Sequence, residues 1–261
     1  MAGNARGTGP KVSVRGRKNG SGQQGVENEI LRSIPRSELG MLLPFMEITA
    51  LSARSVLNEA AKPIEHCYFP NDGVVSIIHV MTDGRSIEVG LTGKEGFIGL
   101  PVIVGYEVSL VRSIIQVNAT SYKVSAENLK TVLQSCPVLE RNLQRYSQEL
   151  SIQSIQIAAC NRLHSVDQQL SRWLLMTQDR VGKSTFPLTQ EFISHMLGTR
   201  RASVSVAAGT LQKRGLITYT RGQVNIQDRA GLEKASCECY REINKLLEAW
   251  GKVSLLTTSP E

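Results

Sequence analysis

The stretch from Pro137 to Asn161 contains no glycine and, after its first residue, no proline, and this feature constrains the fold more than any other. Proline suits the first position of a helix, where its missing N–H group would have no partner in any case. We therefore expect one continuous helix of about 25 residues, which is about 37 Å long. In a chain of 261 residues, long enough for two compact domains, such a helix separates the region before it from the region after it.

This helix carries two apolar stripes. One stripe alternates spacings of four and three residues, as in a two-helix coiled-coil seam, and the other lies on a different face. Two apolar faces are best used by packing one onto the chain's own domain and the other onto a second copy. We predict a homodimer with a parallel coiled-coil interface; the alternative is a helix buried within a monomer. The expected dimer interface consists of Leu139, Leu143, Tyr146, Leu150, Gln153 and Ile157, and the second stripe consists of Ile152, Ile155, Ala159 and Leu163.

Residues 63–124 consist of β-branched runs that turn sequences interrupt at intervals of about ten residues, which is typical of short antiparallel strands. Two of these turns are Asn71-Asp72-Gly73 and Thr82-Asp83-Gly84, in which glycine reaches a positive φ without steric penalty. The pattern predicts an antiparallel, jelly-roll-like β-roll with one or two short helices before it in residues 27–62. The expected domain spans residues 27–136, and the expected strands include residues 74–81, 86–91 and 113–117.

The positive charge of the chain is concentrated in two segments. Residues 1–26 contain five Lys or Arg, no acidic residue and seven glycines, and we expect a disordered basic tail there. Residues 165–229 contain nine basic and four acidic residues, whereas residues 27–164 contain twelve and fourteen and residues 230–261 contain four and five. Clustered Lys and Arg side chains attract polyanions and release the counterions of nucleic acids. The charge distribution therefore predicts a nucleic-acid partner.

The segment from residue 165 to residue 229 has the pattern of a winged helix-turn-helix domain. Ser165 and Gln168 form a capping box that begins a helix after a hinge at residues 161–164, so residues 137–164 are assigned to the long helix and hinge. Further on, Gly198 supplies the turn between two short amphipathic helices, and Thr199 is expected to cap the second. The buried positions of these two helices are expected to be Ile193, Met196 and Leu197 in the first and Val204, Ala207, Ala208 and Leu211 in the second.

A helix-turn-helix unit of this kind places the outward N-terminal half of its second helix in the major groove of DNA. Adjacent arginines there suit a bidentate pair of hydrogen bonds to guanine, and a hairpin wing around Arg221-Gly222 can approach the phosphate backbone. Double-stranded DNA is therefore the predicted partner. The residues expected to contact it are Thr189, Gln190, Thr199, Arg200, Arg201, Ser203, Ser205, Val206, Tyr219 and Arg221.

The order of a β-roll, a long helix, a hinge and a winged helix-turn-helix resembles the Crp/Fnr family of bacterial transcription regulators, over residues 30–230. The resemblance implies an α+β fold, a cyclic-nucleotide-binding-like sensor domain, a dimer on a palindromic operator and RNA polymerase as a further partner. It also implies that an effector signal passes through the long helix. The Arg200-Arg201 pair and the Cys-Glu-Cys-Tyr sequence at residues 237–240 look like an uncharacterised alphaproteobacterial subgroup of the family.

Two departures from the family pattern bear on mechanism. Cyclic-nucleotide-binding members have a Gly-Glu pair for the ribose, but Leu100 follows Gly99 here, while Arg112-Ser113 matches the phosphate-binding pair. The missing acid removes a charge-assisted hydrogen bond of about 1.5–3 kcal/mol, so cAMP is not the expected effector and Arg112 is interpreted as structural. The recognition helix has Ala202 and Val206 where many members have glutamate and arginine, so its base reading must differ. The candidate effector pocket is Gly99, Leu100, Arg112 and Ser113.

The cysteines do not suggest a cofactor. Their number is odd, five, and their scatter fits free thiols in a reducing compartment. No N-terminal cysteine run is present for an iron–sulfur cluster. Cys160 and His164 have a spacing that allows metal binding, but we interpret them as packing residues. Cys237 and Cys239 fall in an expected helix, residues 231–250, whose apolar face includes Leu247 and Trp250, and residues two apart there point to different faces. We predict no metal site and leave redox activity of this pair open.

Other classes of function find no support in the sequence. It contains no Gly-x-Ser-x-Gly elbow, no phosphate-binding loop with lysine and no His-Glu-x-x-His motif, so we expect no enzymatic activity. No apolar run approaches the about 20 residues of a membrane span, and the basic N-terminus lacks the apolar segment of a secretory signal. We expect a cytoplasmic regulator that reads a palindromic operator through the helix after Gly198. The alternative is an effector-sensing protein-interaction module whose helix-turn-helix does not read DNA specifically.

Overall fold

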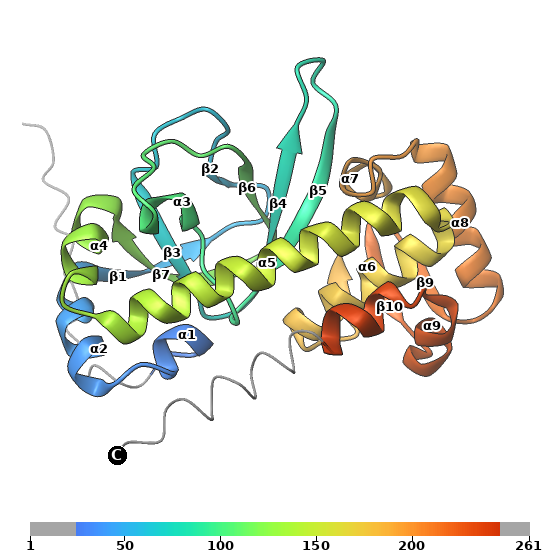
Figure 1. The fold of residues 1–261 in the computed structure, drawn as a ribbon. Helices are drawn as coiled ribbons and strands as arrows, with labels where there is room; N and C mark the ends of the chain where they lie inside the picture. The colour runs from blue at the N-terminus through green and yellow to red at the C-terminus, as the bar shows by residue number, and fades with distance from the viewer. Residues whose placement is uncertain (1–24, 246–261) are drawn as a thin grey trace, which may run out of the picture.

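The computed structural model describes residues 25–245 (Figure 1). Residues 1–24 of the predicted tail (residues 1–26) and the end of the chain, including Leu247 and Trp250, lie outside the described residues. The N-terminal part folds into an antiparallel β-roll of two sheets, with strand orders β1-β7-β3 and β2-β6-β4-β5. The three predicted strands are present as β4, β5 and β6. The strands of the roll are β1 (Met46–Leu51), β2 (Val56–Asn58), β3 (His66–Pro70), β4 (Val74–Val80), β5 (Ser86–Thr92), β6 (Arg112–Val117) and β7 (Ala119–Ser125).

Turn chemistry sets the register of the roll. Gly73, between β3 and β4, has a φ of 73°, and a Cβ atom on it would lie 2.5 Å from the Asn118 carbonyl oxygen. Only glycine fits this turn without displacing backbone. The β4–β5 hairpin turns at Gly84, and its pairing shifts between Ile77 and Ile78. Helices close the ends of the roll: α1 (Glu29–Arg32), α2 (Arg36–Leu42), a 3₁₀ turn (Leu43–Phe45), α3 (Leu100–Ile103) and α4 (Ala126–Leu133).

The long helix is α5 (Pro137–Leu163), and it crosses the whole molecule (Figure 1). Its N-terminus is capped from another element, because the Glu38 carboxylate of α2 accepts hydrogen bonds from the N–H groups of Val138, at 3.0 Å, and Leu139, at 2.8 Å. Glu38 is buried, so this cap fixes the start of α5 against the N-terminal helices. Anchored at this end, α5 lies along the roll and reaches the C-terminal domain.

The prediction for the faces of α5 is wrong. The stripe assigned to the dimer interface packs within the chain: Tyr146 lies against Gly96, and Gln153 Oε1 accepts a hydrogen bond of 2.6 Å from the N–H group of Leu91. The exposed stripe is the second one, in which Ile155 is 68% and Leu163 75% exposed. The physical reason is that β5 offers an edge with unpaired backbone groups, which the polar Gln153 can satisfy. The residues of the covered stripe are Leu139, Leu143, Tyr146, Gln153 and Ile157, which are buried, and Leu150, which is half-buried.

After α5 the chain forms a small helical domain with a three-stranded sheet of order β8-β10-β9. The predicted capping box at Ser165 and Gln168 begins α6, and Gly182, in the left-handed conformation, ends it. The short strand β8 was not expected from the sequence; it pairs with β10 through Phe186 and Val224. The elements are α6 (Val166–Val181), β8 (Thr185–Pro187), α7 (Gln190–Met196), α8 (Arg201–Lys213), β9 (Ile217–Thr220), β10 (Gln223–Ile226) and α9 (Arg229–Ala235).

The C-terminal helix expected from residue 231 to residue 250 is interrupted. α9 ends at Ala235, and its C-cap residue, Ser236, is extended, with φ −74° and ψ 161°. The chain becomes helical again only at Cys239. Because of this break, Cys237 and Cys239 do not follow helical spacing, and the expectation that they face different sides of one helix is wrong.

The largest apolar core spans both parts of the molecule. It includes Val74 and Leu91 from the roll, Ile157 from α5, and Trp173 and Leu174 from α6. Among residues 25–245, no helix combines the length and apolar character that a membrane-spanning segment requires.

Candidate nucleic-acid interface

Helices α7 and α8 form the helix-turn-helix unit that the sequence predicts. Thr189 caps α7, since its hydroxyl accepts a hydrogen bond of 3.2 Å from the Phe192 N–H group. Gly198 makes the turn with a φ of 59°. The positions expected to be buried, Ile193, Met196, Leu197, Val204, Ala207, Ala208 and Leu211, are all buried. The two helices are therefore held by one apolar seam.

The outward face of α8 carries the predicted DNA-contacting side chains. Arg201, Ser205 and Val206 are exposed, Val206 to 71%. Arg200 is the N-cap residue and makes no side-chain capping bond, so the expectation that Thr199 caps α8 is wrong. The reason is that α8 begins one residue later than its sequence pattern suggests. Ser203 is half-buried on the same turn.

Some predicted contact residues are engaged within the domain. The Ser205 hydroxyl donates a hydrogen bond of 2.7 Å to Gln190 Oε1, which links α8 to α7. The Tyr219 hydroxyl donates to the Leu188 carbonyl oxygen, at 2.8 Å, so this proton holds the wing onto the domain. Arg221 remains exposed at the tip of the wing, in a turn where its φ is 49°. Of the two wing residues, only Arg221 offers a free positive charge at the surface.

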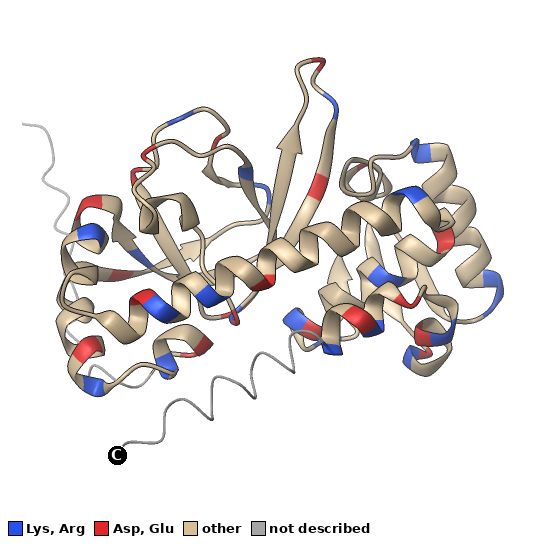
Figure 2. Ribbon diagram, in the orientation of Figure 1, with Lys and Arg blue, Asp and Glu red and all other residues tan. Residues whose placement is uncertain are grey.

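The β4–β5 hairpin rises beside α7, as Figure 1 shows. Ile87 of this hairpin packs against the turn between α7 and α8, since a Cβ atom on Gly198 would be 2.7 Å from Ile87 Cδ1. A hollow of about 940 Å³ lies between the hairpin tip and the start of α8. In Figure 2 the tip shows both charge colours, and both ends of α8 are basic. The hollow is lined by residues 83–86 of the hairpin and by Ser194, His195, Gly198, Thr199, Arg200 and Ser203.

Comparison with known proteins assigns this unit. Residues 168–235 match the family model of the Crp-like helix-turn-helix domain. This part of the chain is a Crp-like helix-turn-helix domain. The match runs from the first turn of α6 to the end of α9, and thus includes the two helices, the turn and the wing.

Over about three quarters of its length, the chain has the fold of Crp/Fnr transcription regulators. It is similar to FixK2 from Bradyrhizobium japonicum (TM-score 0.63, 15% identity, 74% of this chain and 98% of that chain). It is also similar to the c-di-GMP-responsive global regulator CLP from Xanthomonas campestris (TM-score 0.62, 16% identity, 74% of this chain and 99% of that chain). A Crp/Fnr-family transcriptional regulator from Thermus thermophilus is similar with a TM-score of 0.60 and 16% identity, over 73% of this chain and 98% of that chain. At these identities the likeness establishes the fold. The comparison with curated proteins gave no match.

The candidate effector pocket of the roll is nearly filled. Gly99, Leu100 and Ser113 line a hollow of only about 60 Å³. Ligand pockets are typically about 300–1,000 Å³, so this space does not accept a nucleotide. Arg112 is not part of the lining; its Nε donates to both carboxylate oxygens of Glu59, at 3.0 Å, and this hydrogen bonding lowers the pKa of Glu59. Arg112 is therefore held by Glu59 in this structure, outside the lining of the small hollow.

A buried carboxylate joins the roll to the Crp-like domain. Glu88 on β5 is 2% exposed, and its Oε1 accepts a hydrogen bond of 2.8 Å from Trp173 Nε1 on α6. Its other oxygen, Oε2, has no hydrogen-bond partner among the described residues. Burial raises the pKa of Glu88 to about 7, against the opposing effects of the Trp173 hydrogen bond and the charge of Arg172. Nearby, Arg180 of α6 donates to Glu95, at 2.7 Å, and to the Leu91 carbonyl oxygen.

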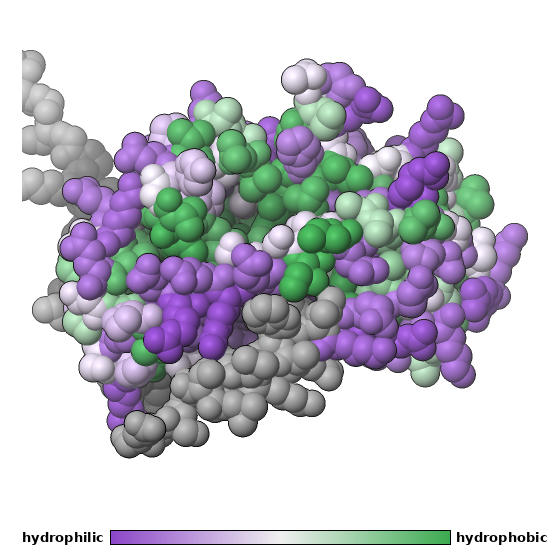
Figure 3. Space-filling model, in the orientation of Figure 1, coloured by the Kyte–Doolittle hydropathy of each residue, from purple (hydrophilic) through white to green (hydrophobic). Residues whose placement is uncertain are grey.

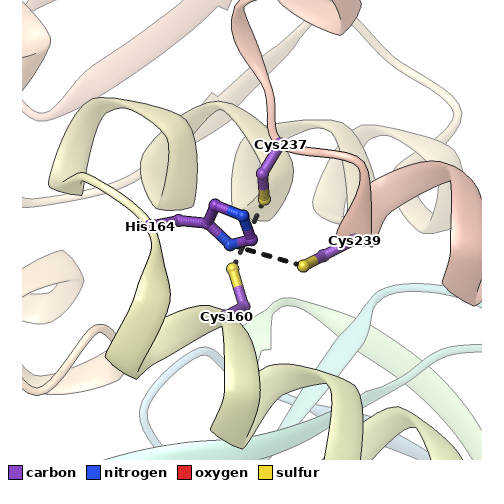
Figure 4. A group of neighbouring side chains, drawn as sticks. All are labelled: Cys160, His164, Cys237 and Cys239. Carbon is purple, nitrogen blue, oxygen red and sulfur yellow. Dashed lines mark hydrogen bonds between the residues drawn. The ribbon is translucent and has the colours of Figure 1, made fainter.

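Four side chains of the types that bind metal ions meet beside the Crp-like domain, a group that was not expected from the sequence. Cys160 and His164 come from the end of α5, Cys237 comes from the break after α9, and Cys239 comes from the start of the helical turn that follows (Figure 4). Hydrogen bonding with Cys237 and the charge of Arg172 lower the pKa of Cys160. The α5 spacing was the available signal, but the partners lie more than 70 residues away along the chain. Only the fold brings the two pairs together.

An exposed apolar surface follows the middle and end of α5. Figure 3 shows green side chains along this helix, bordered by polar ones. The exposed stripe contains Ile155, Ala159 and Leu163, with Ile152 half-buried beside them. Contiguous apolar surface with a polar rim is typical of protein–protein contact sites.

Proposed function

We propose that the chain is a homodimeric, sequence-specific DNA-binding transcription regulator that reads a two-fold symmetric operator through α8. The observation that carries this proposal is the exposed N-terminal half of α8, with Arg201 and Val206 directed outward from a Crp-like helix-turn-helix domain. In Crp/Fnr-fold regulators this helix is the element that reaches DNA, which makes the exposed side chains of α8 the candidate readers.

The side chains of α8 suggest how bases are read. An exposed arginine can form two hydrogen bonds with guanine O6 and N7, and Arg201 is the best placed residue for this contact. Val206 offers an apolar surface that suits a thymine methyl group. Ser203, the Thr199 hydroxyl and Arg221 of the wing would bind phosphates, together with the basic surplus of residues 165–229.

We assign the dimer contact to the exposed stripe of α5. Two copies that pack in parallel along Ile155, Ala159 and Leu163 would cover this apolar surface. The two α8 helices would then be related by a two-fold axis, as a palindromic operator requires.

The remaining parts have supporting roles in this proposal. The roll, residues 27–136, is the sensor domain, residues 137–164 form the dimerisation helix and hinge, and residues 165–229 bind DNA. Residues 230–261 complete the C-terminal end, of which residues 246–261 lie outside the described part. The small hollow beside Gly99 argues against cAMP as the effector. Regulation would act on RNA polymerase, in the cytoplasm and without enzymatic activity.

A second candidate function is an effector-sensing protein-interaction module. Ala202 and Val206, which offer no charged contact to bases, favour it, as does the hairpin tip beside the start of α8. Such a module would still bind DNA through its basic surface, but without sequence preference. Attraction between basic side chains and phosphates is independent of base sequence, and its affinity falls as the salt concentration rises.

The test is selection of binding sites from a random duplex library by the purified full-length chain. We expect enrichment of a two-fold symmetric sequence, and Arg201→Ala should lose preference at one base step per half-site, at a cost of about 1–3 kcal/mol. Lys213→Ala, which removes the same charge from the far end of α8, should keep the full preference. A library without enrichment, but with salt-dependent binding, would support the second function instead.

The dimer contact is tested by sedimentation of the free protein. Leu163→Glu places charge in the exposed stripe of α5 and should shift the chain from dimer to monomer. Ile48→Glu, a matched change at a residue that is 62% exposed on β1, should leave the dimer intact. A wild-type chain that sediments as a monomer, or a Leu163→Glu variant that stays dimeric, would refute this contact.

A further inference from the structure

We propose that Cys160, His164, Cys237 and Cys239 bind one zinc ion in a closed tetrahedral site, which ties the end of α5 to the segment after the Crp-like domain. The proposal does not depend on DNA binding, because it rests on the geometry of these four side chains and on the groups that surround them.

The ligand atoms already have the spacing of a single metal site. All four lie within 4.8 Å of one another; Cys160 Sγ and Cys237 Sγ are 3.4 Å apart, and Cys239 Sγ and His164 Nδ1 are 3.5 Å apart. Around a tetrahedral zinc ion with bonds of about 2.3 Å to sulfur and about 2.0–2.1 Å to nitrogen, neighbouring ligand atoms are about 3.5–3.8 Å apart. A small adjustment of side chains is enough to place an ion at the centre of the group in Figure 4.

The backbone explains why the four side chains converge. Cys160 and His164 are four residues apart at the last turn of α5, and therefore lie on one face. Cys237 lies in the non-helical break after α9, and Cys239, two residues further on, begins the next helical turn. The break brings the two thiols to the same side (Figure 4). A continuous helix there would have separated them.

The histidine is oriented as in known metal sites. His164 directs Nδ1 toward Cys239 Sγ, while its Nε2 lies 3.2 Å from Glu238 Oε1. Histidine ligands commonly donate their second ring N–H group to a carboxylate, which fixes the tautomer and makes the ligating nitrogen more basic. Gln169 Nε2 donates a hydrogen bond of 2.8 Å to the His164 carbonyl oxygen, which fixes the backbone of the same residue.

The sulfur atoms are surrounded by donors that suit thiolates. Arg172 Nε lies 3.3 Å from Cys160 Sγ and its Nη1 lies 3.3 Å from Met176 Sδ, and Gln156 Nε2 donates to Cys239 Sγ, at 3.1 Å. Arg172 is only 1% exposed. A buried guanidinium needs negative charge nearby, and neutral thiols and thioethers are weak acceptors. Three thiolates, a neutral histidine and Zn²⁺ carry one net negative charge, which the guanidinium balances.

The donor set points to a structural zinc ion. Zinc accepts Cys₃His coordination, and four protein ligands leave no position for a water molecule or substrate. The three cysteines are buried and the histidine side chain is 16% exposed, so the ion would be shielded from solvent. An iron–sulfur cluster needs ligands spread around several atoms, rather than four donors converging on one point.

The position of the site defines its effect. His164 is the C-cap of α5 and stands at the hinge, between the long helix and α6. Through the ion, this hinge would be joined to the chain after α9, so that the last turn of α5 and the C-terminal end of the Crp-like domain move together.

The experiment measures metal binding by the purified full-length chain under reducing conditions. We expect one zinc ion per chain by elemental analysis. After chelation, added Co²⁺ should produce the visible and near-ultraviolet absorption of tetrahedral cobalt–thiolate coordination, and Zn²⁺ should abolish it. Cys237→Ser and Cys239→Ser should each lose this spectrum, whereas Cys136→Ser, which alters a buried thiol elsewhere, should keep it.

A milder variant keeps the test independent of folding. Glu238→Gln alters the partner of His164 at a side chain that is 60% exposed, and it should weaken zinc binding about 10- to 100-fold with an unchanged circular dichroism spectrum. Glu242→Gln, a matched change one helical turn further on, should leave zinc affinity unchanged. The proposal is overturned if the wild-type chain binds neither Zn²⁺ nor Co²⁺, if the two serine variants give the wild-type cobalt spectrum, or if mass spectrometry of the reduced preparation shows a Cys160–Cys237 disulfide.

Discussion

Replacing Glu88 by glutamine should change how the stability of the protein depends on pH. Glu88 lies between β5 and α6, and burial raises its pKa from 4.5 to about 7. Between these two values the folded protein keeps the proton that the unfolded chain releases. As the pH rises through this window, ionisation of Glu88 stabilises the unfolded chain but not the folded protein, which still holds the proton. The Glu88 carboxyl group therefore lowers the free energy of unfolding across this window. Glutamine keeps an oxygen for Trp173 and has no proton to lose.

The magnitude follows from the two pKa values. A difference of one pKa unit between the folded and unfolded states is worth about 1.4 kcal/mol, so the full effect on the free energy of unfolding is about 3 kcal/mol. Part of it has already developed at pH 5.5. The advantage of Glu88→Gln over the wild type should therefore grow by about 2 kcal/mol between pH 5.5 and pH 8, and should level off above pH 7.

Urea unfolding of both proteins at a series of pH values measures this difference directly, because the titration of all other groups cancels. Glu65→Gln makes the same substitution at an exposed carboxylate of the roll and serves as the control. A flat difference for Glu88→Gln, or one that shrinks as the pH rises, would show that the Glu88 carboxyl is ionised in the folded protein at all these values, and would refute the reasoning.

Two further substitutions test how α5 is held. Gly96→Ala puts a Cβ atom 2.3 Å from the Tyr146 ring and should lower the free energy of unfolding by about 1–3 kcal/mol, measured in urea. Gly40→Ala, which has open space around it, should not lower it. Equal effects of the two substitutions would contradict the packing of Tyr146 against Gly96. Glu38→Ala removes the partner of two N–H groups at the start of α5 and should cost about 1–2 kcal/mol, measured in the same way; an unchanged unfolding midpoint would mean that solvent replaces the cap.

The features that the sequence predicted correctly are those set by local patterns. Glycine at a positive φ marks the turn at Gly73, the absence of helix breakers marks α5, and an apolar seam of fixed period marks the helix-turn-helix unit. Each depends on residues that are close together in the chain, so the pattern alone contains the information.

The features that could not be predicted depend on distant partners. Both stripes of α5 are apolar, and the one that is buried is decided by Gln153 meeting the Leu91 N–H group. The Cys and His group requires a helix break at Ser236, where neither glycine nor proline signals an end. The strand β8 exists because β10 offers it a free edge. Spacing within one segment cannot reveal such contacts.

The core shared by the roll and the Crp-like domain bears on how this protein unfolds and how its parts can be exchanged. Leu91 and Trp173 belong to one apolar cluster, and the Gln116 amide donates to the Thr177 hydroxyl, at 3.0 Å, across the same boundary. The two parts should therefore unfold in a single cooperative transition. A chimera that joins this DNA-reading end to a foreign sensor would expose α6 unless it also carried the β4–β5 hairpin. In this chain the exchangeable unit is larger than the domain that the sequence delimits.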